Sequence, residues 1–365
     1  MHIKNRISRL YNNIDEKLDA ILIKNANEPF LDTNFFYVTG LSKGLFEGSV
    51  ALVYSKGDID IIVPELEAQS AAKSPANILV YKNNEECDQI LKKSVKGLKK
   101  IGVNFSGLSY QNYIKLHELL PKIKFIDISM ALSKTRAIKD NDEIGKIKKA
   151  CSIADKVMES IKESLSKNMY EYEIAAEINY LLQKFGADRP AFDTISSFGK
   201  NTAEPHYTHG NTKLGRGDFV LFDFGARFEK YNSDTTRTIV YGVASKEQKL
   251  MHDIVKSAQQ VGFDSLSSGI KGSEVHEKVQ NYIDATKFKG RFIHSTGHSL
   301  GLDVHDGWIG FSRDCDIELQ ENMILTVEPG IYVPGYGGVR IEDDVLIRKD
   351  GAEILTHSSR QLIEA

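Results

Sequence analysis

Two segments in the second half of the chain each have the pattern of a β-hairpin with an acidic residue on both arms, and this pattern constrains the fold most. The first covers residues 218–241, with arms rich in β-branched and aromatic residues and a predicted turn near 228–230. A turn centred there puts Asp223 opposite Asp234, with Cβ atoms about 5 Å apart. Gly225 shares the face of Asp223 and leaves space beside it. Two carboxylates this close repel each other, so the pattern predicts a positive group between them.

The second segment repeats the arrangement. Its arms are residues 324–333 and 339–347, and the Pro-Gly-rich stretch around Gly335 predicts the turn. This register places Glu328 opposite Glu342. A carboxylate on the inner face of a strand is costly unless it is paired or bound to a metal.

Three of the ten histidines, His294, His298 and His305, lie within twelve residues of one another. One histidine joined to the four carboxylates makes a hard, oxygen-rich ligand set that suits Mn(II), Co(II), Fe(II) or Zn(II) in a paired site. A closed structural zinc site is not favoured by this set. Spacing alone leaves a structural explanation open, since single strand aspartates are commonly turn or solvated residues and loop histidines are commonly structural.

The residues resemble the metallopeptidase family with the pita-bread fold, which includes methionine aminopeptidase, aminopeptidase P and prolidase. The matching segments, in chain order, are DFGARFEKYNSDTTRT, HSTGHSLGLDVHD, TVEPGIY and GGVRIEDDV. The resemblance implies five metal ligands: Asp223, Asp234, His298, Glu328 and Glu342. It also implies that Asp234 and Glu342 bridge two metal ions. Asp223 would then hold one ion, while His298 and Glu328 hold the other.

The resemblance implies roles for further residues near this ligand set. His206 and His305 match catalytic histidines that contact the substrate and the tetrahedral intermediate, and Glu328 matches a catalytic proton shuttle. His294 and Arg340 match residues expected at the substrate-binding side of the site. For the histidines other than His298, and for Arg340, a hydrogen-bonded structural role is the alternative.

Alternating strand and helix patterns predict a smaller N-terminal α/β domain over residues 1–130, followed by the catalytic domain over 131–365. The expected fold class is α+β, with a pita-bread C-terminal domain. Aminopeptidase P, prolidase and creatinase carry such an extra N-terminal domain, whereas simple methionine aminopeptidases do not. Within it, the apolar spacing predicts a helix over residues 6–24 and a strand over 35–38.

The resemblance implies a dinuclear exopeptidase that cuts the Xaa-Pro bond by means of a hydroxide bridging two divalent ions, Mn(II) or Co(II) first and Zn(II) or Fe(II) second. We expect an Xaa-Pro aminopeptidase, with prolidase, the Xaa-Pro dipeptidase, as the alternative. Prolidases tend to place an arginine a few residues after the VH[DE] motif, and residues 306–310 contain none; the next is Arg313. The substrate would be a proline-containing peptide.

Charge and cysteine content exclude other classes. With 47 basic and 50 acidic residues, the net charge is −3, which argues against a broadly basic nucleic-acid-binding surface. The three cysteines are scattered, so neither a disulfide framework nor a cysteine zinc site is predicted. The N-terminal residues do not resemble a signal peptide, and no stretch approaches the roughly 20 apolar residues of a membrane span. We expect a cytoplasmic protein and, from the family resemblance, a homodimer.

The sequence leaves open two alternatives from other classes of protein. Residues 297–301 and 40–44 both fit the GxSxG pattern of serine hydrolases, and Asp303 with His357 would complete the order Ser–Asp–His. The second alternative is an inactive pita-bread protein that binds peptides or partners. Metal content separates that protein from the enzyme.

Overall fold

The computed structural model describes residues 2–365, and the chain divides into two compact units, Met1–Arg136 and Ala137–Ala365. The strands of the first unit are β1 (Ala20–Lys24), β2 (Val50–Val53), β3 (Ile59–Pro64), β4 (Asn77–Tyr81), β5 (Lys100–Val103) and β6 (Lys124–Asp127). Its helices are α1 (His2–Asn12), α2 (Thr33–Thr39), α3 (Ala68–Ala71), α4 (Asn84–Ser94) and α5 (Tyr110–Leu119). Helix α6 (Ser129–Ala137) reaches the first residue of the second unit.

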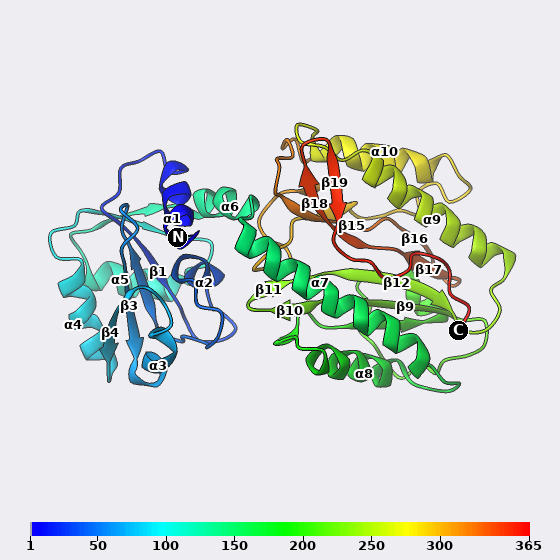
Figure 1. The fold of residues 1–365 in the computed structure, drawn as a ribbon, viewed down its shortest axis with the longest axis horizontal. Helices are drawn as coiled ribbons and strands as arrows, with labels where there is room; N and C mark the ends of the chain where they lie inside the picture. Colours follow the sequence, from blue (N-terminus) through cyan, green and yellow to red (C-terminus); the bar gives the residue numbers. More distant parts are fainter. Residues whose placement is uncertain (1) are drawn as a thin grey trace. The chain divides into compact units, whose positions relative to one another are not determined.

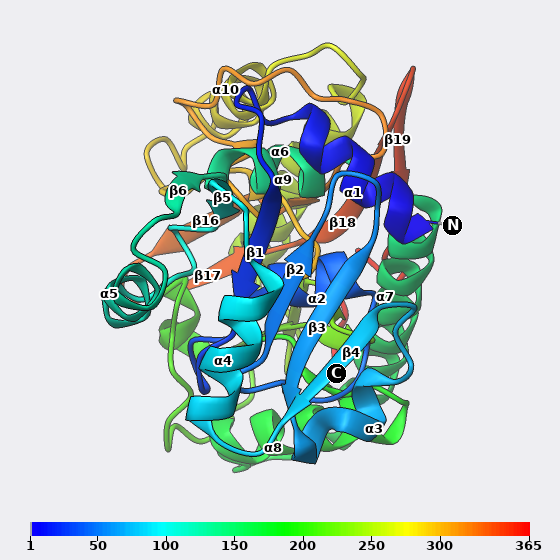
Figure 2. The ribbon, with the colours of Figure 1, turned by 90° about the vertical axis from the view of Figure 1, so that its left-hand side faces the viewer.

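The first unit is built on one six-stranded sheet with the order β4-β3-β2-β1-β5-β6. β2 runs antiparallel to β1 and β3, and the remaining neighbours are parallel. Helices α4 and α5 follow β4 and β5 along the chain and pack on one face of the sheet (Figure 2). Residues on both faces of β1 and β2 are buried, which explains their continuous apolar runs.

Two local predictions for this unit were wrong. The helix expected over residues 6–24 ends at Asn12, and residues 20–24 form β1 instead. Four consecutive apolar residues occupy that segment, a pattern that suits a strand buried on both faces better than a helix with one apolar stripe. The strand expected over residues 35–38 is helix α2, capped by the Asp32 side chain and ended by Gly40 in the left-handed conformation.

The second unit contains four long helices and several short antiparallel sheets. The helices are α7 (Asn141–Ile161), α8 (Glu171–Lys184), α9 (Lys246–Asp264) and α10 (Gly272–Asp284). The first strands are β7 (Arg189–Pro190), β8 (Ile195–Phe198), β9 (Phe219–Phe224), β10 (Ala226–Phe228), β11 (Tyr231–Asn232) and β12 (Thr235–Val240). The later strands are β13 (Gly297–His298), β14 (Gly310–Phe311), β15 (Ile324–Val327), β16 (Gly330–Val333), β17 (Gly337–Arg340), β18 (Asp343–Arg348) and β19 (Gly351–Ile354). Among residues 2–365, no helix is both long and apolar enough to cross a membrane.

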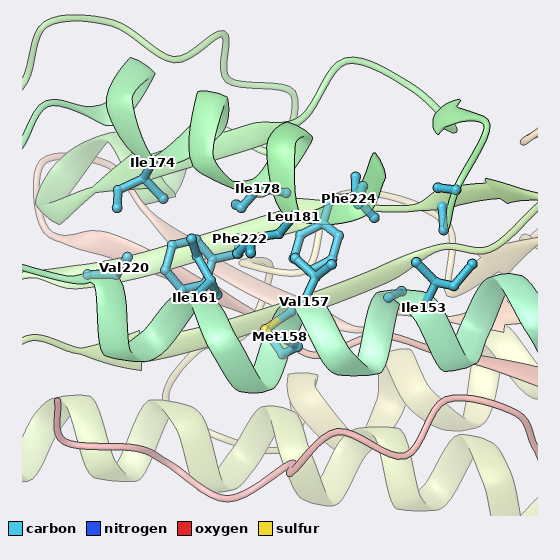
Figure 3. Close-up of a cluster of buried hydrophobic side chains, with 14 of the residues drawn as sticks. Ile153, Val157, Met158, Ile161, Ile174, Ile178, Leu181, Val220, Phe222 and Phe224 are labelled. Atoms are coloured by element: carbon cyan, nitrogen blue, oxygen red, sulfur yellow. The ribbon is translucent and has the colours of Figure 1, made fainter. Parts of the chain in front are cut away.

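Each pair of helices covers one group of strands (Figure 1). Helices α7 and α8 enclose an apolar cluster with alternate residues of β9, as Figure 3 shows. The labelled members of this cluster are Ile153, Val157, Met158, Ile161, Ile174, Ile178, Leu181, Val220, Phe222 and Phe224. Helices α9 and α10 pack in the same way on residues of β15, β17 and β18.

Strand alternation then assigns the polar residues to the opposite face. Val220, Phe222 and Phe224 face α7 and α8, so Asp223 points the other way. By the same reasoning, Val339 and Ile341 pack in the cluster with α9 and α10, and the intervening Arg340 points away from it. The helices therefore hold the strands while the strands present charged residues on their far face.

Gly225, at the interruption between β9 and β10, is predicted to be essential for folding. A Cβ atom at this position would lie 1.8 Å from the Ser233 carbonyl oxygen, so Gly225→Ala should lower the free energy of unfolding by at least roughly 2 kcal/mol. Gly145, inside α7, has open space around it, and Gly145→Ala should raise stability by about 0.5–1 kcal/mol. Urea unfolding followed by the fluorescence of Trp308, the one tryptophan, reports on this unit. Equal stability of the two variants would contradict the prediction.

Candidate metal centre

The first acidic hairpin forms, but its register differs from the prediction. Asp223 pairs with Thr236, not with Asp234. The turn consists of Glu229 and Lys230, both with positive φ, so it is centred closer to the second arm than expected. A shift of two positions keeps the same face of the strand, and Asp223 and Asp234 still lie on one side.

The second hairpin has the predicted register. Val327 pairs with Asp343, and Gly330 pairs with Arg340. Glu328 and Glu342 are therefore opposite each other where the ladder is interrupted between these two pairs. At this interruption the backbone N–H groups of Glu328 and Glu342 donate to the carbonyls of Thr296 and Thr236 instead of to each other's strand, so neighbouring segments hold both residues.

His298 lies among these carboxylates. Its Nε2 atom is 3.6 Å from Asp234 Oδ2 and 3.7 Å from Glu328 Oε1. Ligand atoms of Asp234, His298 and Glu342 all fall within 4.8 Å of one another. The Nδ1 atom of His298 is 3.2 Å from the Ser299 carbonyl oxygen, which assigns the proton to Nδ1 and leaves Nε2 free to bind a metal.

Asp223 is held by a cation. Arg340 Nη2 donates to Asp223 Oδ2 over 2.6 Å, and both side chains are buried. The remaining donors of Arg340 reach Thr236 Oγ1 at 3.0 Å, Tyr332 Oη at 2.9 Å and the Pro205 carbonyl at 3.3 Å. A positive group lies beside Asp223, whereas the prediction of one between Asp223 and Asp234 stays a prediction. The donors of Arg340 are used inside the protein, so Arg340 positions Asp223, and its direct contact with substrate stays a prediction.

Burial and mutual repulsion act on the other carboxylates. Burial, together with the charges of Glu342 and Asp223, raises the pKa of Asp234 well above its usual range. Burial and the charge of Glu328 do the same to the pKa of Glu342. Burial raises the pKa of Glu328 to about 7, although the charge of Arg340 opposes this shift.

The donor set fits divalent cations. Asp223 Oδ1 and Asp234 Oδ1 are buried and have no hydrogen-bond partner. Burial lowers the pKa of His298 to about 4, so its imidazole is neutral near pH 7 and available as a ligand. Buried, unpaired carboxylate oxygens beside a neutral imidazole are costly without a cation and favourable with one.

The remaining predicted histidines lie around this group. The ring centroid of His305 is 4.1 Å from that of His298, and the residue is exposed. His206 is exposed and within electrostatic range of His294 and His305. The Nε2 atom of His294 is 2.8 Å from Tyr332 Oη, and its Nδ1 atom is 2.8 Å from the Ser295 carbonyl. Burial, with the nearby charge of Arg340, lowers the pKa of His294 to about 3.

Several residues that orient the site were missed by the sequence analysis. Thr236 donates to Glu342 Oε2 over 2.6 Å, and Thr326 Oγ1 lies 3.4 Å from Glu328 Oε1. Tyr332 links Arg340 to His294, and Asp344 accepts a hydrogen bond from the backbone of Asp234. The hairpin pattern carried a signal for the two threonines, because both occupy strand positions on the face of the carboxylates.

The structure argues against a serine nucleophile. Ser299 is buried, and its hydroxyl donates to the Asp306 carbonyl. Gly297–His298 forms strand β13, and residues 301–308 after it contain no helix. In the other GxSxG match, Gly40 ends helix α2, so a helix precedes Ser42 instead of following it.

The free energy of unfolding of the metal-free protein should depend on pH through the ionisation of Glu328. The pKa of this residue is about 7 in the folded chain and 4.5 in a model compound, so its contribution to stability is present below about pH 4.5 and is lost as the pH rises through about 7. The substitution Glu328→Gln removes this pH-dependent loss of stability. The free energy of unfolding of the variant relative to wild type should therefore rise by up to roughly 3 kcal/mol across this window, measured by urea unfolding in chelator. Glu159→Gln, at an exposed position of α7, is the control, and a flat difference for Glu328→Gln contradicts the assignment.

Comparisons with known families match both units. Residues 145–349 match the model of metallopeptidase family M24. Residues 6–138 match the creatinase/prolidase N-terminal domain. The resemblance inferred from the four motifs is thereby confirmed.

Individual relatives cover almost the whole chain. An Xaa-Pro dipeptidase of Pyrococcus horikoshii is 38 % identical over 346 residues, which is 95 % of each chain. The structure of an Xaa-Pro dipeptidase from Bacillus anthracis has a TM-score of 0.90, 33 % identity and full coverage of both chains. An X-Pro aminopeptidase from Thermotoga maritima has a TM-score of 0.91 and 32 % identity, covering 98 % of this chain and 100 % of its own.

These matches confirm the predicted fold class, a pita-bread catalytic domain joined to a smaller N-terminal α/β domain. They also account for the hard ligand set, because M24 enzymes are metallopeptidases. The chain belongs to metallopeptidase family M24 and carries a creatinase/prolidase N-terminal domain.

Proposed function

We propose that this chain is a dinuclear metal-dependent exopeptidase that hydrolyses Xaa-Pro bonds, with Xaa-Pro dipeptides as its main substrates. The observation that carries the proposal is the convergence of buried carboxylates on the Nε2 atom of His298. The dipeptide preference is supported by the names of the relatives from Pyrococcus horikoshii and Bacillus anthracis. This reverses the order expected from the sequence, in which the aminopeptidase came first.

The second candidate is an Xaa-Pro aminopeptidase that acts on longer peptides. The Thermotoga maritima structure with this name matches as well as the dipeptidase structures do. In addition, residues 306–310 provide no arginine to bind the terminal carboxylate of a dipeptide, and the next one, Arg313, is an exposed residue after β14. These observations support a test that compares the two peptide lengths directly.

The charge of the site supports two divalent ions. Asp223, Asp234, Glu328 and Glu342 contribute four negative charges when ionised, and Arg340 contributes one positive charge. The group then carries a charge of −3, so two divalent ions together with one hydroxide would bring it to neutrality. The hard oxygen donors favour Mn(II) or Co(II), with Zn(II) or Fe(II) as further candidates. Asp234 and Glu342 would be shared between the ions.

Individual residues of the chain would have separate roles in hydrolysis. When bound, divalent ions would supply a Lewis acid for the scissile carbonyl and lower the pKa of the attacking water. Glu328, whose Oε1 atom lies 3.7 Å from His298 Nε2, would accept a proton from the nucleophile and return it to the leaving proline nitrogen. His305 and His206 are exposed at the site, and we assign them to the substrate carbonyl and its oxyanion. His294, fixed by Tyr332, borders the side where the substrate would bind.

Activity on an Xaa-Pro dipeptide should depend on divalent metal and exceed activity on the matching Xaa-Pro-Yaa tripeptide. The test measures kcat/KM for both peptides after removal of metal with EDTA, and again after addition of Mn(II), Co(II) or Zn(II). An Xaa-Ala dipeptide is the control for proline specificity. A tripeptide preference would make the chain an aminopeptidase. Activity that is insensitive to EDTA would contradict the metal mechanism.

Glu328→Gln should lower kcat by at least roughly 100-fold, because glutamine cannot carry the proton. The control is Glu159→Gln, at an exposed position of α7, which should retain wild-type activity. Metal content, measured by mass spectrometry on both variants, separates loss of proton transfer from loss of metal. Full turnover by Glu328→Gln would remove Glu328 from this role.

A further inference from the structure

Asp234 differs from the other carboxylates of the site in how it is held. Three of them have a side-chain donor: Arg340 for Asp223, Thr236 for Glu342 and Thr326 for Glu328. Among residues 2–365, no side-chain hydrogen bond reaches the Asp234 carboxylate. Its Oδ1 atom is buried without a partner, and the Nε2 atom of His298 is 3.6 Å from its Oδ2 atom.

The orientation of Asp234 therefore depends on its main chain. The residue lies between β11 and β12, outside both ladders. On one side, the Asn232 side chain donates to the carbonyls of Gly301 and Leu302. On the other side, the backbone N–H of Asp234 donates to Asp344 Oδ2 over 3.0 Å. These bonds fix the interruption that turns the carboxylate toward His298.

Asp344 is itself held by hydrogen bonds to two further residues. The residue is fully buried, and its backbone N–H donates to Thr356 Oγ1 over 3.2 Å. The Sγ atom of Cys151, on α7, lies 3.3 Å from the same Oδ2 atom that accepts from Asp234. Cys151 is also fully buried, so water cannot replace its thiol as the donor. Helix α7 is thereby linked to Asp234 through one carboxylate oxygen.

We propose that Asp344 and Cys151 form a positioning pair that sets the main chain of Asp234, and through it the metal affinity of the site. The proposal rests on the proposed function, since Asp234 is taken there as a shared metal ligand. Neither member of the pair belongs to the proposed set of metal ligands. Removing a group that holds a metal ligand in place commonly lowers metal affinity or activity by about 10–100-fold.

The two members should contribute unequally. Asp344 holds the backbone of Asp234 directly, whereas Cys151 acts through Asp344, and a thiol is a weak donor. Asp344→Ala should therefore weaken Mn(II) binding by about 10–100-fold. Asp344→Asn keeps an acceptor oxygen for the Asp234 N–H and should restore most of the affinity. Cys151→Ser keeps a donor and should resemble wild type, while Cys151→Ala should lose a few-fold.

The experiment is titration calorimetry of the full-length, EDTA-treated chain with Mn(II), followed by kcat and KM for an Xaa-Pro dipeptide at saturating Mn(II). Cys315→Ala is the matched control, because it removes another buried thiol of the same unit. A positioning role predicts weaker Mn(II) binding and lower kcat, with KM little changed. Circular dichroism shows whether each variant is folded.

Folded Asp344→Ala with wild-type Mn(II) affinity would overturn the proposal. If Asp344→Ala does not fold, the two Cys151 variants decide, and equal affinity of Cys151→Ala and Cys151→Ser overturns it. Wild-type chain that binds no Mn(II) overturns the proposed function and this inference with it. Wild-type chain that binds about two ions, with variants that bind equally well, overturns only the positioning pair.

Discussion

Repulsion among buried carboxylates is the constraint on which the second unit depends. Asp234, Glu328 and Glu342 lie around His298, and burial with mutual repulsion raises the pKa of Asp234 and Glu342 well above the usual range. The guanidinium of Arg340 is paired with Asp223. Such a group is tolerated only if the rest of the fold holds it rigidly and cations compensate it.

The rigidity comes from the division of each strand into two faces. Phe222 and Phe224 pack under α7 and α8, and the residue between them, Asp223, points to the centre. Ile341 packs with α9 and α10, and its neighbour Arg340 points to Asp223. Because alternate residues have opposite tasks, a slip of one position would bury the charges under the helices and expose the aromatic residues. The same hydrophobic packing that stabilises the unit therefore determines the geometry of the site.

This periodicity also explains how much could be predicted from the sequence. The register of the second hairpin was correct because the turn around Gly335 is marked by its composition. The register of the first was displaced by two positions, since Glu229 and Lys230 adopt positive φ, which neither residue type usually does. The face was still correct, because an even shift preserves it. In the first unit, the strand at residues 20–24 was taken as helix because its apolar run continues the spacing of α1.

Contacts between distant segments could not be predicted in this way. The run of Glu342, Asp343 and Asp344 is the best example, because three adjacent acids have three different partners. Glu342 accepts from Thr236, Asp343 pairs with buried Arg237 over 2.6 Å, and Asp344 holds the backbone of Asp234. The hairpin register singled out Glu342, but nothing local distinguishes Asp343 from Asp344, since the partner of each is more than 100 residues away along the chain. Only the folded arrangement separates the acid that supports the strand from the acid that orients a neighbouring ligand.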